Sequence, residues 1–402
     1  MTEFVDGHIH ALFAGRELSG AVLAEVGNLT QLASCVASFI ELNSELTWLD
    51  LSSIDAGSDL AKSLDRWALD EICEHLPLVI HTSDHHSICV NSKALEVAGF
   101  DLVAPEVAGG HFELSESKPN GWVREYSAME LIYAHQPKPT LEQDLASLLR
   151  AQDLLLEYSV VAMQEAWIDP GMPEVYLEAV ARDLLKIRTN LAIRLTPEDF
   201  REKLKFATQT RLKINNSGAP LLSCNSVKIF TDGVISSGTA NLLGEPSEPL
   251  WNDSELKSAC LNADRLGFQL HIHATGDGGV RQAIDAIEYV CRTQLPRDRR
   301  PVIAHAERIN AQDVDRLVKY DITVNCQPYW APDAATGELE FRKLLDAGVR
   351  LSFGSDWPVN TPEPTAGLDR LRESALSNAQ HRLTDEEALR AYTETAAWQM
   401  YI

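Results

Sequence analysis

The chain has 402 residues, of which 45% are hydrophobic and 23% are charged, and its formal net charge is −24. This length is enough to bury one large hydrophobic core or two ordinary ones. The acidic balance argues against nucleic acid and anionic membrane surfaces as partners, because both attract basic surfaces. Seven scattered cysteines without a CxxC motif are typical of a reduced cytoplasmic protein, and neither a membrane span nor a secretory signal is visible.

The first predicted strand covers residues 4–10 and contains His8 and His10. Successive side chains of a strand alternate between its two faces, so both imidazoles lie on the same face. Two imidazoles side by side can hold one metal ion, and the remaining ligands must come from later in the chain.

Residues 11–140 are expected to form an insertion with its own α+β structure. Helices are predicted over residues 31–46, 60–76 and 92–98, and short strands over 46–51 and 77–82. Residues 100–122 are rich in glycine and proline and are expected to be a loop.

From residue 141 onward, helices and strands alternate regularly. Together with residues 4–10, the predicted strands are centred near residues 160, 190, 226, 268, 301, 322 and 350. Such alternation implies parallel strands, and eight units predict a (β/α)8 TIM barrel made of residues 1–10 and 141–402. A doubly wound open sheet is the alternative, although no GxGxxG fingerprint follows the first strand.

Polar residues occur at the carboxyl ends of several predicted barrel strands, where TIM barrels place their active sites. They are His8, His10, Lys228, His273, His305 and Asp356. Each alone is more often a cap, a snorkelling side chain or a satisfied polar group. Their joint placement on five strands of one barrel favours a metal-dependent active site.

The sequence resembles the amidohydrolase superfamily, in particular the amidohydrolase-3 branch, which includes N-substituted formamide deformylases. The matching segments are 84–86 (Asp-His-His), 90–95 (Val-Asn-Ser-Lys-Ala-Leu), 227–233 (Val-Lys-Ile-Phe-Thr-Asp-Gly), 273–277 (His-Ala-Thr-Gly-Asp), 304–306 (Ala-His-Ala), 327–328 (Gln-Pro) and 354–358 (Gly-Ser-Asp-Trp-Pro). Relatives normally carry a small β-sandwich as well, which we expect to be absent from this chain.

The resemblance implies a centre of two divalent metal ions, most often zinc. His8, His10 and Asp356 would hold one ion, and His273 and His305 the other. Lys228 would bridge them as a carbamate, since a buried amine near two dications loses its proton easily and gains two ligand oxygens by adding CO2. An unmodified structural Lys228 and a one-metal enzyme are the alternatives.

The expected activity is hydrolysis of an amide-type C–N bond, other than a peptide bond, in a small organic substrate by a metal-bound hydroxide. Asp356 would be the catalytic residue that accepts and returns the proton. The same residues could serve another metal-barrel hydrolase that acts on a lactone, an ester or a phosphoester. A catalytically inactive binding barrel is the third hypothesis for the function. A homodimer is a separate hypothesis for the assembly of the protein.

The insertion is expected to cover the barrel mouth and to shape specificity. Asp84 and His86 are candidate substrate-binding residues, with stabilisation of their own turn as the alternative. Further candidates are Trp122, Glu165, Asp232 and Trp330. His271 shares a strand face with His273 and is expected to be a core residue or to support the ligands.

Overall fold

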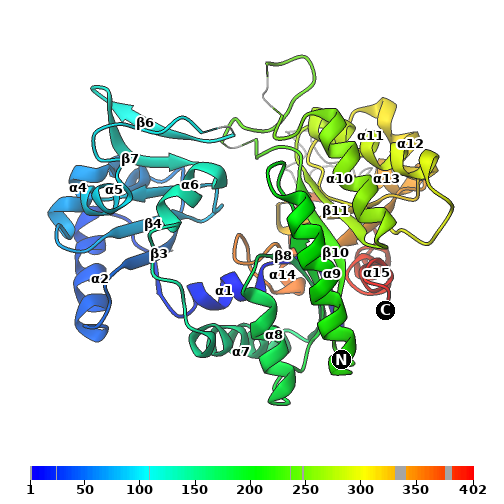
Figure 1. The fold of residues 1–402 in the computed structure, drawn as a ribbon, viewed down its shortest axis with the longest axis horizontal. Coiled ribbons are helices and arrows are strands. Elements are labelled where there is room, and N and C mark those ends of the chain that lie inside the picture. Colours follow the sequence, from blue (N-terminus) through cyan, green and yellow to red (C-terminus); the bar gives the residue numbers. More distant parts are fainter. Residues whose placement is uncertain are drawn as a thin grey trace. The chain divides into compact units, whose positions relative to one another are not determined.

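The computed structural model describes residues 2–23, 25–107, 109–235, 237–246, 249–330, 341–375 and 383–402. The chain divides into two compact units (Figure 1). The first consists of Met1–Leu12 and Leu148–Ile402, and the second of Phe13–Ser147. Helices α1 (Ala11–Glu17) and α7 (Leu141–Glu157) span the two boundaries.

The first unit contains an eight-stranded parallel sheet in which each strand pairs with the next one along the chain. Its strands are β1 (Phe4–Ile9), β8 (Val160–Ile168), β9 (Arg188–Arg194), β10 (Leu222–Phe230), β11 (Gln269–Ala274), β12 (Val302–His305), β13 (Thr323–Cys326) and β14 (Arg350–Phe353). This sequential order is that of a barrel, whereas a doubly wound sheet reverses its order part-way. The predicted TIM barrel is therefore confirmed.

Helices alternate with these strands, as parallel connections require. They are α8 (Met172–Ala181), α9 (Phe200–Ser217), α10 (Asp253–Arg265), α11 (Asp277–Thr293), α12 (Val314–Lys319), α13 (Phe341–Asp346), α14 (Pro364–Ala375), α15 (Asp385–Ala391) and α16 (Glu394–Gln399). Short 3-10 helices cover Ala311–Asp313 and Pro328–Trp330. None of the helices described is long and apolar enough to cross a membrane.

The barrel closes where β1 meets the segment after β14. The Asp356 N–H donates to the His8 carbonyl at 2.8 Å, and the His10 N–H donates to the Trp357 carbonyl at 2.9 Å. A Cβ at Gly354 would lie 2.5 Å from the His8 nitrogen. Glycine at this position therefore allows the two strands to approach closely.

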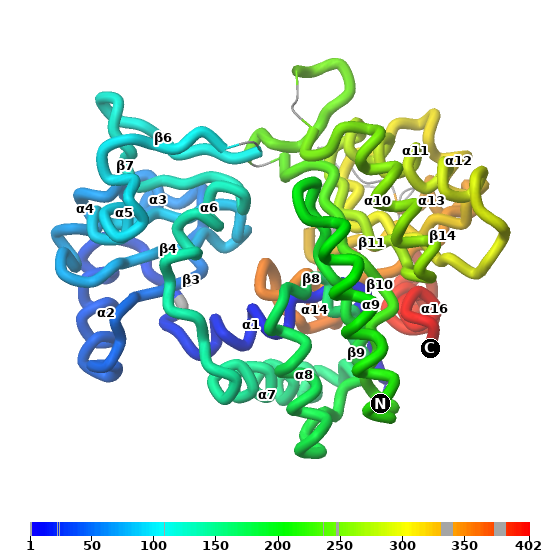
Figure 2. The backbone as a smooth tube through the Cα atoms, in the orientation of Figure 1, coloured from blue at the N-terminus to red at the C-terminus, as the bar shows by residue number. Residues whose placement is uncertain are grey.

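A layer of buried amide and hydroxyl side chains lies inside the barrel. Its members are Gln164, Asn190, Ser226, Gln269, Asn325, Ser352 and Gln399, joined by hydrogen bonds of 2.5 to 3.4 Å. Gln399 enters it from the last helix, α16, which packs on β1 and β14. The red last helix, α16, can be followed in Figure 2.

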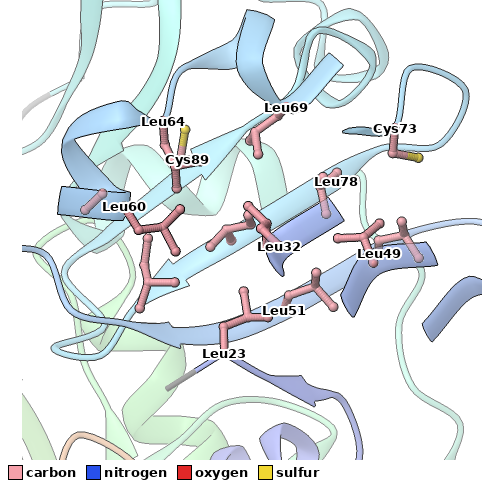
Figure 3. Close-up of a cluster of buried hydrophobic side chains, with 14 of the residues drawn as sticks. Leu23, Leu32, Leu49, Leu51, Leu60, Leu64, Leu69, Cys73, Leu78 and Cys89 are labelled. Atoms are coloured by element: carbon pink, nitrogen blue, oxygen red, sulfur yellow. The ribbon is translucent and has the colours of Figure 1, made fainter. Parts of the chain in front are cut away.

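The second unit contains a six-stranded mixed sheet in the order β2-β3-β4-β5-β7-β6. Its strands are β2 (Ala21–Val22), β3 (Leu49–Ile54), β4 (Leu78–Thr82), β5 (Ser87–Val90), β6 (His111–Ser115) and β7 (Lys118–Arg124), and its helices are α2 (Leu29–Leu42), α3 (Asp59–Ser63), α4 (Arg66–Ile72), α5 (Ser92–Ala98) and α6 (Tyr126–Tyr133). Leucines of β3, β4 and the helices lie in one hydrophobic cluster of this unit (Figure 3), and residues such as Val79, Ile88 and Val123 form a second one. The described strands belong to these two sheets, without a β-sandwich.

The prediction that residues 100–122 form a loop is wrong. They include β6 and most of β7, an antiparallel hairpin. Its two turn residues, Glu116 and Ser117, have φ angles of 50° and 68°. Such a turn usually contains asparagine and glycine, so this sequence lacks the usual hairpin signal.

Gln399 provides a test of how the last helix supports the barrel. Its amide donates to the Gly7 carbonyl at 2.8 Å and accepts from Ser352 Oγ at 2.5 Å. Gln399→Ala leaves both buried groups without this partner, so we expect the free energy of unfolding to fall by about 2–4 kcal/mol in urea denaturation. Glu394→Ala on the exposed side of the same helix is the control and should change it by about 0.5 kcal/mol or less. Equal stabilities of the two variants would contradict this role.

Candidate metal centre

Three predicted ligands meet at the seam between β1 and β14. Asp356 Oδ1 lies 3.3 Å from His8 Nε2 and 3.1 Å from His10 Nε2. Within the described part of the chain, these three residues form the group whose His, Cys, Asp or Glu ligand atoms converge within 4.8 Å. The carboxylate and the two imidazoles thus form a group that could hold a metal ion.

The contacts in this group fit a shared cation better than bonds among the three side chains. Asp356 Oδ1 is buried and makes no hydrogen bond of acceptable geometry, although two imidazole nitrogens are close to it. A buried carboxylate oxygen without a partner is costly. Nitrogen and carboxylate oxygen donors are those that zinc and similar ions prefer, so the residues present fit a divalent metal.

The backbone around the predicted ligands is unusual. Asp356 has a φ of 56° and His305 has a φ of 72°. Residues other than glycine seldom adopt this region, and where they do the surrounding structure enforces it. The Asp6 carboxylate is part of this surrounding structure, because it holds the backbone on both sides of the seam. Its Oδ1 accepts hydrogen bonds from the His8 N–H at 3.1 Å and from the Ser355 N–H at 3.0 Å.

Lys228, His273 and His305 lie in the same cluster. Lys228 Nζ is 3.1 Å from His8 Nε2. The His305 ring lies 4.9 Å from the His8 ring and 4.4 Å from the His273 ring, between centroids. The structure therefore brings together all six residues that the sequence placed at the strand ends.

Burial sets the protonation of this cluster. It lowers the pKa of Lys228 to about 7 and that of His305 to about 4. Burial also holds the pKa of His8 well below its usual range, with the charge of Lys228 as a further cause. For Asp356 burial acts in the opposite direction, but the imidazoles of His10 and His8 keep its pKa well below the ordinary value. Neutral imidazoles beside an ionised carboxylate are the ligand forms that a metal requires.

The imidazoles of His305 and His8 each contact another side chain through Nδ1. His305 Nδ1 lies 2.8 Å from Gln327 Oε1, and His8 Nδ1 lies 2.7 Å from His271 Nε2. Gln327 Nε2 in turn donates to Asn325 Oδ1 at 3.1 Å, which fixes the orientation of its amide. Such outer contacts usually orient the ring of a metal ligand and select its tautomer.

A sequence model described as "Amidohydrolase family" matches residues 4–402. The chain belongs to the amidohydrolase family. The resemblance inferred from the motifs is thereby confirmed, and family membership implies a metal-dependent hydrolase with a divalent metal.

Two similar proteins and one solved structure illustrate the relationship. The protein LONG AFTER FAR-RED 3 of Arabidopsis thaliana is 25% identical over 435 residues, covering 98% of this chain and 73% of that protein. N-substituted formamide deformylase of Arthrobacter pascens is 26% identical over 359 residues, covering 82% of this chain and 65% of that protein. An uncharacterised metal-dependent hydrolase from Pyrococcus horikoshii OT3 matches in fold, with a TM-score of 0.76 at 20% identity over 100% of this chain and 81% of the other.

Within this amidohydrolase barrel, the predicted substrate residues Trp330 and Asp232 have different surroundings. Trp330 stacks on His305, with 5.8 Å between ring centroids and 29° between planes. Asp232 is buried and accepts hydrogen bonds from the backbone N–H groups of Thr275, Gly276 and Asn241, each at 2.9 Å. Trp330 thus borders the cluster, whereas Asp232 fixes the loop that follows β11.

The remaining substrate candidates, Asp84, His86 and Trp122, belong to the second unit. Asp84 accepts from Thr82 Oγ1 at 2.6 Å and from the His86 N–H at 3.1 Å, within its own turn. His86 Nδ1 lies 2.8 Å from Glu125 Oε2. Trp122 is buried in the core and donates to the Leu64 carbonyl at 2.8 Å. These contacts support the stabilising alternative for Asp84, and the three substrate roles stay predictions.

Glu165 on β8 lies beside the start of α1. Its Oε2 accepts from Tyr176 Oη at 2.5 Å and from the Leu12 N–H at 3.3 Å, while its buried Oε1 makes no hydrogen bond. Burial raises its pKa from 4.5 to about 7. The folded chain therefore binds this proton more tightly than the unfolded chain does.

The raised pKa of Glu165 predicts how the free energy of unfolding depends on pH. The stabilisation from Glu165 is present in full below its unfolded pKa near 4.5 and is lost as the pH rises through 7. Relative to Glu165→Gln, which cannot titrate, wild type should lose up to about 1.4 kcal/mol of unfolding free energy per pH unit in this window. Urea denaturation of the metal-free proteins at pH 5, 6 and 7 measures these unfolding free energies, with the exposed Glu157→Gln variant as control. If the difference in unfolding free energy between wild type and Glu165→Gln does not change with pH, Glu165 does not titrate between pH 5 and 7.

Proposed function

We propose that the protein hydrolyses an amide-type C–N bond, other than a peptide bond, in a small organic substrate and that its activity depends on a divalent metal. The convergence of His8, His10 and the buried Asp356 Oδ1 at the carboxyl ends of the barrel strands carries this proposal. Barrels of this type hold their active sites at that end. The similarity to a protein named N-substituted formamide deformylase supports the C–N bond as the target.

The residues present divide into two ligand sets. We propose that His8, His10 and Asp356 hold one zinc ion, that His273 and His305 hold a second, and that Lys228 lies between them. A bound divalent metal supplies Lewis acidity, which lowers the pKa of water and polarises a substrate carbonyl.

Asp356 is the proposed catalytic residue. Its low pKa keeps the carboxylate ionised at neutral pH, so that it can orient an attacking water and accept a proton. The same proton then passes to the nitrogen of the leaving amine, which departs as a neutral molecule. The hydrogen bond from the Asp356 N–H to the His8 carbonyl fixes where this carboxylate lies.

Lys228 is proposed to act as a carbamate. Burial lowers its pKa to about 7, so a large fraction of the side chain is the neutral amine near neutral pH. The amine attacks CO2, forms an N–C bond and releases one proton, which leaves a carboxylate with two oxygens. That group is anionic and can bridge two cations, whereas an ammonium cannot bind a metal.

Asp356→Asn tests the proton-transfer role. The amide keeps the size of the side chain but cannot accept the proton, so we expect kcat to fall by about 10²- to 10⁴-fold while the unfolding temperature stays near that of the wild type. The assay is release of amine from a panel of N-formyl and N-acyl amines. Asp346→Asn, an exposed position on α13, is the control and should keep full activity. An active Asp356→Asn variant would exclude this role.

Metal removal tests the dependence on a cation and on Lys228 together. We expect chelator treatment to abolish turnover and zinc to restore it, faster with bicarbonate than in CO2-depleted buffer, because the carbamate must form again. Lys228→Met should regain little activity in either buffer. Reactivation at the same rate with and without bicarbonate would contradict the carbamate. Turnover of matched esters or lactones but not of amides would contradict the assignment of the bond.

A further inference from the structure

His271 is a buried histidine on β11 that is not among the predicted metal ligands. It precedes His273 by two residues, so both side chains lie on the same face of the strand. The side chain is fully buried, and the strand register pairs His271 with Lys228 on β10. Its Nε2 lies 2.7 Å from Nδ1 of His8, with 4.8 Å between the ring centroids.

Two imidazole nitrogens at this distance must share one hydrogen. If neither carried it, two lone pairs would face each other, and if both did, two hydrogens would clash. The bond therefore has two forms: His8 donates from Nδ1 to His271, or His271 donates from Nε2 to His8. Both rings stay neutral in either form, and only the positions of their hydrogens differ.

The opposite nitrogen of His8 decides between these forms. His8 Nε2 faces Asp356 Oδ1 and Lys228 Nζ, at 3.3 and 3.1 Å. To bind a metal there, Nε2 needs its lone pair, so the hydrogen of His8 must be on Nδ1. His271 Nε2 must then be the acceptor, and the hydrogen of His271 must be on its own Nδ1.

We propose that His271 is a positioning residue which accepts a hydrogen bond from His8 Nδ1 and so holds His8 in the tautomer that binds metal through Nε2. The inference rests on the proposed function, because it assumes that His8 is a ligand. The arrangement has a cost that a core-filling residue would avoid, since His271 Nδ1 is buried and makes no hydrogen bond. An apolar side chain would fill the same space without this cost but would offer His8 no acceptor.

In the other form, His271 donates to His8 Nδ1, and His8 Nε2 carries a hydrogen between Asp356 Oδ1 and Lys228 Nζ. Binding of a metal to this form requires both rings to exchange tautomers together. The number of protons bound by the pair does not change.

The test measures zinc affinity of the full chain by competition with a chromophoric chelator, so that its readout does not depend on turnover. His271→Leu removes the acceptor, and we expect zinc affinity to fall by about 10- to 100-fold, as for other outer contacts of metal ligands. His271→Gln places a carbonyl oxygen within reach of His8 Nδ1 and should restore most of the affinity. Ile272→Ala is the control for packing, because this buried side chain on the same strand points to the other face. It should lower the unfolding temperature and leave zinc affinity unchanged.

Loss of affinity in His271→Leu with recovery in His271→Gln would support the proposal. Wild-type affinity in His271→Leu, or an equal loss in both His271 variants, would overturn it and leave the proposed function intact. Failure of the wild type itself to bind zinc would overturn both.

Discussion

The pair of backbone hydrogen bonds between β1 and the segment after β14 is the constraint on which the rest of the site depends. Asp356 donates to the His8 carbonyl, and His10 donates to the Trp357 carbonyl. These bonds join the first strand of the barrel to the last, although their residues are about 350 positions apart in the sequence. A side chain at Gly354 would separate the two strands, because its Cβ would touch the His8 backbone. The candidate metal site therefore depends directly on barrel closure, and a change that opens this seam would disrupt the proposed ligands as well as the fold.

Burial sets the protonation states of the side chains in the site, and it is also the main free-energy cost of the site. A low dielectric favours neutral lysine and histidine, as the lowered pKa values of Lys228, His8 and His305 show. The same environment makes an ionised Asp356 expensive unless positive charge is nearby. A divalent cation at this site would resolve the conflict, because it would stabilise the carboxylate and use the lone pairs of the neutral imidazoles. The buried polar layer around Gln399 satisfies its own hydrogen bonds and so adds rigidity inside the barrel without adding charge.

The sequence was sufficient to predict the barrel and its six strand-end residues, because both follow from local patterns. Strand period and the alternation of helices place His8, Lys228 and Asp356 at one end of a barrel before any distance is known. The contact between His8 and His271 could not be predicted in this way, because it depends on the tilt and register of strands that are distant in sequence. The hairpin of β6 and β7 was missed for a different reason, since Glu116 and Ser117 adopt a turn that their residue types seldom form. The role of Gln399 could not be predicted either, as for His271. A glutamine at the end of a helix has no local sequence pattern that shows it enters a barrel.

The central claim is that His8, His10 and Asp356 bind a divalent metal inside this barrel. A crystal structure of the zinc-loaded protein, with anomalous differences measured above and below the zinc absorption edge, tests it most directly. The account predicts a zinc peak in contact with His8 Nε2, His10 Nε2 and Asp356 Oδ1, and a second peak beside His273 and His305 with continuous density from Lys228 between them. Zinc bound only at other residues, or no zinc peak within reach of Asp356, would contradict it.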